Sequence, residues 1–598
     1  MSAKTTPKGL KEVTYNDAVA RSKEYFGGDE LAATVWVSKY ALKDSFGHIY
    51  ESSPEDMHHR IAAEIERIEK NYPNPLSRDE IFALLDHFRY VIPQGGPMTG
   101  IGNNLQIASL SNCFVIGHKK PADSYGGIFR MDEEQVQIMK RRGGVGHDLS
   151  HLRPTGSPVL NSALTSTGIV PFMERYSNST REVAQDGRRG ALMLTISIKH
   201  PDAERFIDAK VDTSKVTGAN VSVKIDDEFM RAAIAGKPYH QQFPIDAEKP
   251  MYEQDIDARA LWKKIIHNAW KSAEPGVLFW DTILRESIPD CYADEGFNTV
   301  STNPCGEIPL CPYDSCRLLA LNLYSYVDKP FTAEASFDFS KFRDHVGKAM
   351  RMMDDIIDLE LEKVEQIIAK IDADPEEADI RYVESNLWKK VREMALKGRR
   401  TGLGITAEGD MIAALGMRYG SDKAVAFAVE VHKTLALAAY GASVEMAEER
   451  GAFPLYDAAR ELDNPMIARI READPALYER MVKSGRRNIA MLTIAPTGTT
   501  SLMSQTTSGI EPVFRPVYKR RRKINPSDHN VKVAFVDDTG ERFEEFYVFH
   551  HNFVEWARVN GHDTSTLATI SDAELEKLVA ASPYHKATAN DIDWVAKV

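Results

Sequence analysis

The sequence predicts a mixed α/β protein with a helical N-terminal region, and three observations support this. Before residue 90, apolar residues recur at helical spacing. After residue 90, short β-rich runs alternate with glycine-rich turns and longer helical segments. The length of 598 residues exceeds what one ordinary domain needs. We therefore expect a helical region (1–90), an α/β barrel (91–545) and a final segment of helices and loops (546–598).

The N-terminal region has clear helix signals. Apolar residues fall at helical spacing between residues 56 and 70, at Met57, Ile61, Ile65 and Ile68. Pro73 and Pro75 end that helix, because proline removes a backbone donor. The sequence 77–80 (SRDE) has the pattern of a capping box and predicts a second helix.

The barrel region is predicted from its runs of β-favouring residues. Long helices are expected around residues 341–371 and 424–449. The predicted strands are 110–116, 191–198, 219–225, 318–326, 401–405 and 488–494. The basic run 519–523 is expected to be a solvated loop edge, with contact to a phosphate or a partner chain as the alternative.

Composition and charge indicate a soluble protein that does not coat nucleic acid. The chain is 43% hydrophobic and 27% charged, as globular proteins are. Its formal net charge of −13 argues against broad nucleic-acid binding, although loops can still bind small anions. No signal peptide or membrane-spanning segment is apparent, so we expect a cytoplasmic protein.

The most informative stretch is 301–307, which reads Ser-Thr-Asn-Pro-Cys-Gly-Glu. Pro304 favours an extended backbone before it, and in an extended segment Asn303, Cys305 and Glu307 share one face. An amide, a thiol and a carboxylate would then meet one small substrate. A tight loop with a buried cysteine is an equally good interpretation of this segment alone. A zinc site using Cys305, Cys311 and Cys316 is less favoured, because the spacing contains no CxxC pair.

Five segments resemble motifs of one family and occur in that family's order. They are 109–115 (SLSNCFV), 143–158 with its GGVG and RPTGSP sequences, 303–307 (NPCGE), 315–323 (SCRLLALNL) and 495–501 (APTGTTS). Together they resemble the catalytic subunit of ribonucleotide reductases from about residue 90 to about 525. The resemblance implies a ten-stranded α/β barrel that reduces ribonucleotides to deoxyribonucleotides with a cysteine thiyl radical.

The resemblance also implies the role of each catalytic residue. Cys305 stands where the family has its thiyl radical, which abstracts hydrogen from C3′ of the ribose. Glu307 would be the base on the 3′-hydroxyl, and Asn303 would hold the substrate in register. Cys113 and Cys316 would supply two electrons and become a disulfide. Cys291 and Cys311 match no family role and are expected to be ordinary thiols.

Further residues are expected to bind nucleotides. The loop Pro496, Thr497, Gly498, Thr499 and Thr500 resembles the family's phosphate-binding loop, although a plain turn is the alternative. Gly96, Asn112, Gly144, Pro304 and Gly306 align with other substrate contacts. Residues 185–191 fall where the family has a mobile specificity loop. There Asp186, Arg188 and Arg189 would respond to a deoxynucleotide or ATP effector at the interface of a homodimer; a surface turn is the alternative.

The wording of the motifs resembles the adenosylcobalamin-dependent class best. The alternative is the class whose radical comes from a separate metal-containing subunit. No segment after residue 545 resembles the barrel's last two strands or a cysteine-bearing tail, so we expect a truncated, split or processed chain whose partners are a thioredoxin-type reductant and the missing C-terminal piece. The same motifs also leave open an inactive nucleotide-binding fragment and a relative of pyruvate formate-lyase.

Overall fold

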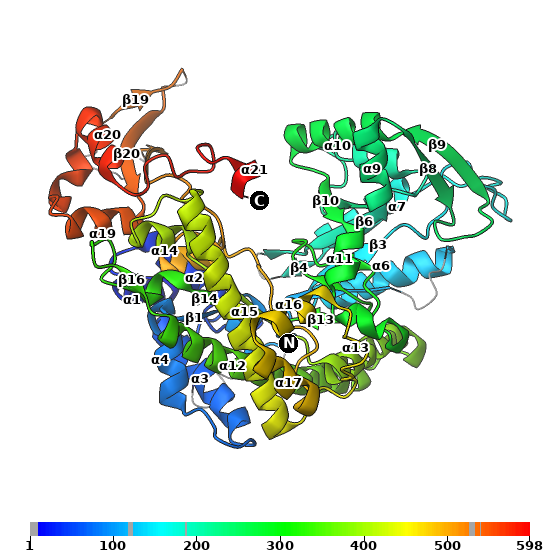
Figure 1. The fold of residues 1–598 in the computed structure, drawn as a ribbon, viewed down its shortest axis with the longest axis horizontal. Helices are drawn as coiled ribbons and strands as arrows, with labels where there is room; N and C mark the ends of the chain where they lie inside the picture. Colours follow the sequence, from blue (N-terminus) through cyan, green and yellow to red (C-terminus); the bar gives the residue numbers. More distant parts are fainter. Residues whose placement is uncertain (1–9, 118–122, 186–187, 525–532, 539, 598) are drawn as a thin grey trace.

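The computed structural model has two main parts joined by long helices (Figure 1). It describes residues 10–117, 123–185, 188–524, 533–538 and 540–597. One part holds a six-stranded sheet with its covering helices, and the other holds the N-terminal helices, a three-stranded sheet and the C-terminal segments. The mixed α/β class predicted from the sequence is therefore correct.

The N-terminal region is helical, as its apolar spacing predicts. Its helices are α1 (Tyr15–Tyr25), α2 (Glu30–Lys39), α3 (Pro54–Glu69) and α4 (Arg78–Leu85). On α3 the apolar stripe is buried, including Met57, Ile61 and Ile65. The capping box at Ser77 and Glu80 is present, and it satisfies backbone donors at the start of α4.

The larger sheet has the strand order β10-β7-β6-β3-β2-β13. Neighbouring strands are parallel except β13, which is antiparallel to β2. The strands are β2 (Cys113–Val115), β3 (Gly144–Asp148), β6 (Leu192–Ser197), β7 (Asn220–Ile225), β10 (Gly276–Phe279) and β13 (Ser315–Cys316). Helices such as α6 (Tyr125–Met139) and α10 (Ala258–Ser272) contribute to its hydrophobic core.

The smaller sheet has the order β1-β14-β17, formed by β1 (Val91–Pro93), β14 (Leu318–Asn322) and β17 (Gly402–Thr406). The predicted strand 318–326 ends early, because residues 323–326 turn into a 3-10 helix. The predicted strand 488–494 lies beside β17 with a single bridge, Leu403 to Leu492. Closure of ten strands into one barrel is not seen among the described residues.

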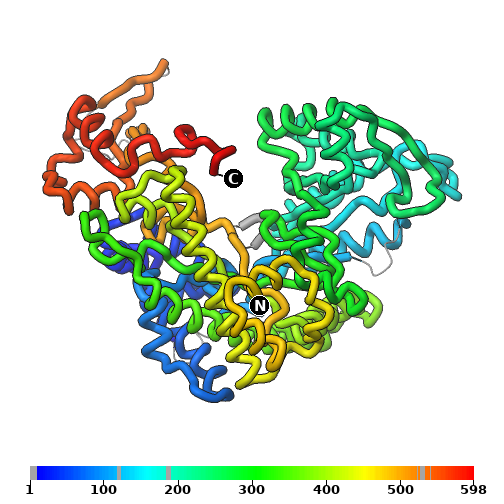
Figure 2. Tube along the Cα trace, viewed as in Figure 1, coloured from blue at the N-terminus to red at the C-terminus, as the bar shows by residue number. Residues whose placement is uncertain are grey.

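Long helices connect the two parts (Figure 1). Helix α12 (Phe339–Asp372) packs against α13 (Ala378–Gly398) and α15 (Asp422–Arg450), close to the predicted helices at 341–371 and 424–449. The chain then returns to the part that holds the N-terminal helices, where the orange and red C-terminal segments lie in the same half as the blue N-terminal helices (Figure 2). Buried Asp410 anchors them by accepting hydrogen bonds from His550, Asn552 and Tyr584, each 2.7 Å long.

The basic run 519–523 forms a strand, so the prediction of a loop is wrong. Strand β18 (Val517–Lys523) pairs with β20 (Arg542–Phe549), which crosses residue 545 and is followed by α19 (His551–Val559) and α20 (Asp572–Ala581). Arg521 pairs with Glu545 at 2.7 Å, so cross-strand ion pairs stabilise an arrangement that local sequence does not reveal. Among the described helices, none has both the length and the apolar character to span a membrane.

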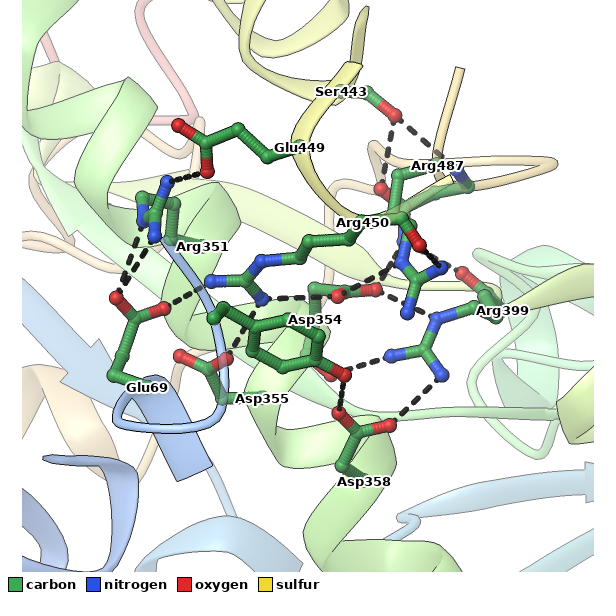
Figure 3. Close-up of polar contacts among 12 residues, drawn as sticks. Glu69, Arg351, Asp354, Asp355, Asp358, Arg399, Ser443, Glu449, Arg450 and Arg487 are labelled. Atoms are coloured by element: carbon green, nitrogen blue, oxygen red, sulfur yellow. Dashed lines mark hydrogen bonds and ion pairs between the residues drawn. The ribbon is translucent and has the colours of Figure 1, made fainter. Parts of the chain in front are cut away.

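A buried charged cluster joins α3, α12 and α15 (Figure 3). Asp354 lies at the centre and pairs with Arg399 (2.8 Å), Arg450 (3.1 Å) and Arg487 (3.1 Å). Arg450 also contacts Asp355 at 2.8 Å. The arginines lower the pKa of Asp354 in spite of its burial, whereas burial raises the pKa of Asp355 well above its usual range.

The charge balance of this cluster explains why its two neighbouring aspartates differ. The labelled acidic side chains are Glu69, Asp354, Asp355, Asp358 and Glu449, and the labelled basic ones are Arg351, Arg399, Arg450 and Arg487. Five carboxylates face four guanidinium groups, so one bound proton makes the cluster neutral. Burial and the neighbouring carboxylates raise the pKa of Asp355 well above its usual range, so Asp355 is the member that most favours binding a proton.

Candidate active site

Residues 303–308 form the tip of a β-hairpin between β11 (Ser301–Thr302) and β12 (Pro309–Leu310). The N–H of Gly306 donates to the carbonyl of Asn303 at 3.0 Å, and Gly306 has φ of 86°, which glycine adopts readily. The prediction of an extended segment is therefore wrong. The hydrogen bond closes a four-residue turn in which Pro304 is the second residue, a position that proline favours, so the chain reverses after Asn303.

Asn303 lies beneath this tip and connects the chemical groups. Its side chain is fully buried, and its amide nitrogen donates to Oε2 of Glu307 at 2.6 Å and to Sγ of Cys113 at 3.1 Å. Its side-chain oxygen accepts the N–H of Ile308 at 3.0 Å. Asn303 therefore positions the carboxylate and a thiol and does not line the cavity described below.

The hairpin packs against the larger sheet through glycines. A Cβ atom on Gly146 would lie 1.8 Å from the carbonyl oxygen of Thr302, and one on Gly144 would lie 2.9 Å from Cγ of Pro304. Both glycines are on β3, so only a strand without side chains there lets the hairpin approach this closely. On β7, the side chain of Asn220 donates a hydrogen bond to the carbonyl of Pro304 at 2.8 Å.

Cys113 and Cys316 are directly opposite each other in the antiparallel pair of β2 and β13. Residues opposite each other in such a pair have Cα atoms about 4.5–5.5 Å apart, which is within the range that a disulfide needs. Both are buried free thiols in this structure. The sequence placed them far apart, and the sheet brings them together.

The electrostatics of the site follow from its burial. Burial raises the pKa of Glu307 above that of a free carboxyl group, and the hydrogen bond from Asn303 partly offsets this effect. Burial also raises the pKa of the Cys113 thiol well above its usual range and that of Cys316 to about 12. Both thiols are therefore protonated at neutral pH. Glu307 keeps its proton to a higher pH than an exposed glutamate does.

One cavity of about 340 Å³ collects most of the predicted residues. Those that line it are Asn112, Cys113, Gly144, Pro304, Cys305, Glu307, Pro496, Thr497, Gly498, Thr499 and Thr500. Asn303, Cys316, Gly96 and Gly306 are not among the lining residues. Gly96 contacts the cavity only through Asn112, because its N–H donates to the Asn112 side chain.

The loop from Pro496 to Thr500 is held from behind by hydroxyl groups. The hydroxyl of Thr497 lies 2.9 Å from that of Thr406 and 3.1 Å from that of Ser508, and it accepts the N–H of Gly509 at 2.7 Å. These contacts occupy the Thr497 side chain. What the loop can offer a ligand is therefore its backbone and the hydroxyl of Thr499.

Sequence reasoning missed several lining residues: Tyr40, Gln94, Gly95, Arg142, Gly143, Ala191 and Leu318. Arg142 is the cationic member of this set, with φ of 75°, and it directly precedes the Gly143-Gly144 motif. Its position before that motif was the one available signal. Tyr40 comes from the N-terminal region, and only the tertiary structure brings it to the cavity.

The predicted specificity loop forms a short hairpin of β4 (Ala184–Gln185) and β5 (Arg188–Arg189), and Asp186 lies outside the described residues. Ala191, two residues after β5, lines the cavity. Cys311 is buried 3.7 Å from Asp314. In the described part of the chain, no group of three or more His, Cys, Asp or Glu side chains is arranged to hold a metal ion.

Comparisons with known proteins agree with the motifs. Residues 111–542 match the family described as "Ribonucleotide reductase, barrel domain". A "Vitamin B12-dependent ribonucleoside-diphosphate reductase" of Mycobacterium tuberculosis is 32% identical over 495 residues, covering 82% of this chain and 62% of that protein. The protein of the same name from Thermoplasma acidophilum is 32% identical over 445 residues, covering 74% and 50%. The "Ribonucleoside-diphosphate reductase large chain" of Neurospora crassa is 25% identical over 451 residues, covering 69% and 45%.

The chain therefore spans 62% of the length of the first of these relatives and less of the other two. The family match covers well over half of this chain and includes the hairpin, the thiol pair and the Pro496–Thr500 loop. This match and the relatives confirm the predicted resemblance: the chain belongs to the ribonucleotide reductase family.

Proposed function

We propose that this chain forms the catalytic site of a ribonucleotide reductase that makes deoxyribonucleotides for DNA synthesis by thiyl-radical chemistry. The observation that supports this most is the grouping of Cys305, Glu307 and Cys113 around one cavity, with Cys316 paired to Cys113. A cavity of this size suits a small-molecule ligand. The Pro496–Thr500 loop at the same cavity suits its phosphates.

Each residue then has a defined task. The Cys305 sulfur takes the hydrogen atom from C3′ and later returns it, which is feasible because S–H and C–H bonds are comparable in strength. Glu307 takes the 3′-hydroxyl proton, and its raised pKa brings it closer to the working pH of a general base. Asn303 keeps Glu307 in place. The 2′-hydroxyl leaves as water, using one proton from the thiol pair.

The thiol pair supplies the electrons. Cys113 and Cys316 together lose two electrons and two protons and form one S–S bond. Their register allows that bond without moving the strands far. A dithiol protein of the thioredoxin type would then reduce the disulfide for the next cycle.

We propose adenosylcobalamin as the radical source, supported by the relatives whose names include "Vitamin B12-dependent". When bound, this cofactor supplies a carbon radical. The position of Cys305 fits this cofactor: the residue is exposed at the hairpin tip, so a large group can reach its sulfur from outside. The 340 Å³ cavity is suited to the nucleotide and too small to enclose a corrin ring.

The substrate and effectors follow the same reasoning. The relatives' names favour a ribonucleoside diphosphate. The β4–β5 hairpin would carry a deoxynucleotide or ATP signal to the cavity through Ala191, which lies two residues after the hairpin, lines the cavity and accepts the N–H of Val145 with its carbonyl at 2.9 Å. We expect this effector site to lie at a homodimer interface.

The test is turnover of CDP and CTP with adenosylcobalamin and dithiothreitol and without any second subunit. Deoxynucleotide should form, and Cys305→Ser should abolish it while nucleotide binding persists. Cys316→Ser should allow at most a single turnover. Product that appears only when a metal-containing subunit is added would support the alternative class. Binding without product under both conditions would contradict the proposal.

A further inference from the structure

The two thiols of the redox pair have different surroundings. Cys113 lines the cavity, whereas Cys316 is fully buried and does not line it. The Cys316 sulfur packs on the backbone of β17, because a Cβ atom on Gly402 would lie 2.4 Å from it. A reductant that enters through the cavity therefore meets Cys113.

Two buried arginines flank Cys316. Arg317 follows it directly in the chain, and Arg400 lies two residues before Gly402. Both side chains are buried: Arg317 contacts the carbonyl groups of Ser315 and Arg400, and Arg400 pairs with Asp314 at 2.6 Å. Arginine keeps its charge even when buried. Both positive charges therefore act on the Cys316 sulfur, and the carboxylate of Asp314 opposes them with a smaller effect.

Each arginine also has an unused donor. Among the described residues, Nε of Arg317 and Nη2 of Arg400 are buried and have no hydrogen-bond partner. Buried donors without partners are rare because each costs about 1–3 kcal/mol. Reduction of the disulfide can leave Cys316 as a thiolate, and the charges of both arginines stabilise that anion.

We propose that Arg317 and Arg400 make Cys316 the leaving group when the Cys113–Cys316 disulfide is reduced, so that the external dithiol attacks Cys113. This inference rests on the proposed function, because it assumes that the two thiols form a disulfide. Direction in thiol–disulfide exchange depends on access to the attacked sulfur and on the stability of the leaving thiolate. Access favours attack on the Cys113 sulfur, and the nearby charges favour Cys316 as the leaving thiolate. Both factors therefore favour the same direction of exchange.

Atoms and electrons balance in this exchange. A thiolate of the dithiol forms a bond to Sγ of Cys113, the S–S bond breaks, and its electron pair stays on Cys316. The second thiol of the dithiol then displaces Cys113 and closes the reductant's own disulfide. Cys113 and Cys316 each take up a proton, which restores both thiols. The pKa directions agree: burial raises the pKa of both thiols, and Glu307 raises both further. For Cys113 the effect of Glu307 is the largest after burial, whereas for Cys316 the lowering effects of Arg400 and Arg317 outrank it.

The direct test labels the two sulfurs in the full-length Cys305→Ser chain, which lacks the neighbouring exposed thiol. The chain is oxidised with diamide, treated briefly with 2-mercaptoethanol, quenched in acid and alkylated in denaturant. Peptide mass spectrometry should find the mixed disulfide on Cys113 and the alkyl group on Cys316. The reverse labelling overturns this inference alone. Failure of the 113–316 disulfide to form contradicts the proposed function as well.

Arginine variants test the cause. Arg317→Gln and Arg400→Gln should each slow cleavage of the disulfide by 2-mercaptoethanol roughly tenfold, because the leaving thiolate loses a positive charge. Arg141→Gln is the matched control, a buried arginine that pairs with Glu384 away from the thiols. Equal rates in all three variants would overturn the role of the arginines. If a variant does not fold, the labelling pattern in the chain with intact arginines still decides the direction.

Discussion

The hydrogen bond between Asn303 and Glu307 makes a sharp prediction about pH dependence. Replacing Asn303 with alanine removes the 2.6 Å bond to Oε2 of Glu307 and leaves the carboxyl group buried. Burial raises the pKa of Glu307, and the bond lowers it, so its loss raises the pKa further. In the proposed mechanism Glu307 acts as a base, which it can do only when ionised. The variant therefore needs a higher pH to reach half of its maximal activity.

The size of the effect follows from the chemistry of the bond. A hydrogen bond to a charged group contributes about 1.5–3 kcal/mol. Because about 1.4 kcal/mol corresponds to one pKa unit, the acid limb of the pH profile should move up by roughly one to two pH units. Activity at low pH should fall far more than activity at high pH.

The assay is kcat/KM for deoxynucleotide formation across pH, which reports the ionisation of the free enzyme. Asn220→Ala is the matched control, since Asn220 holds the same hairpin through the Pro304 carbonyl without contacting Glu307. The control should lower activity without moving the midpoint. If the Asn303→Ala profile keeps the midpoint of the unmodified chain, or if both variants move it equally, the assigned role of Asn303 is wrong.

Three further predictions concern stability and the approach of the hairpin and loop. Asp354→Asn should lower the free energy of unfolding by about 3–5 kcal/mol in urea titrations at neutral pH. Asp355→Asn resembles the protonated acid and should change that free energy by less than about 1 kcal/mol. Equal losses in the two variants would contradict the charge balance. Gly146→Ala should abolish product formation, because its Cβ atom meets the hairpin backbone. The control Gly441→Ala places its Cβ atom in open space on α15, so it should keep activity and add about 0.5–1 kcal/mol of stability. Full activity of Gly146→Ala would show that the hairpin tolerates displacement. Thr497→Val removes a hydroxyl with three partners, so it should raise the KM for nucleotide several-fold with a smaller change in kcat, and an unchanged KM would contradict the support role of that hydroxyl.

The residues that sequence alone could assign are those whose chemistry is in the motif itself. Cys305 and Glu307 fall within one short segment, and Cys113 falls in a second. The long helices were also predictable, since the apolar stripe of α12 persists over many turns. Strand β10 was missed because four residues are too short to show a period.

Other features depend on contacts between distant segments. Asn303 was expected to face the substrate, but its amide lies beneath the hairpin tip, where it holds Glu307 and Cys113. The hairpin itself was not predicted, because it depends on the pairing of residues 301–302 with residues 309–310. Arg317 is the neighbour of Cys316 in the sequence, but nothing local could identify Arg400 as a second one, since the segment that precedes Gly402 reaches the Cys316 sulfur only in the folded chain.

The three sulfurs of the site are held by different kinds of structure, and this division has a consequence for mechanism. Cys113 and Cys316 lie on adjacent strands, so their separation is set by the backbone ladder and a disulfide can open and close with little movement. Cys305 lies on a hairpin whose distance from the sheet is set by close backbone contacts at glycines, above all at Gly146. A side chain at position 146 would therefore move the Cys305 sulfur, the proposed radical site, away from the proposed reducing pair without changing the chemistry of either.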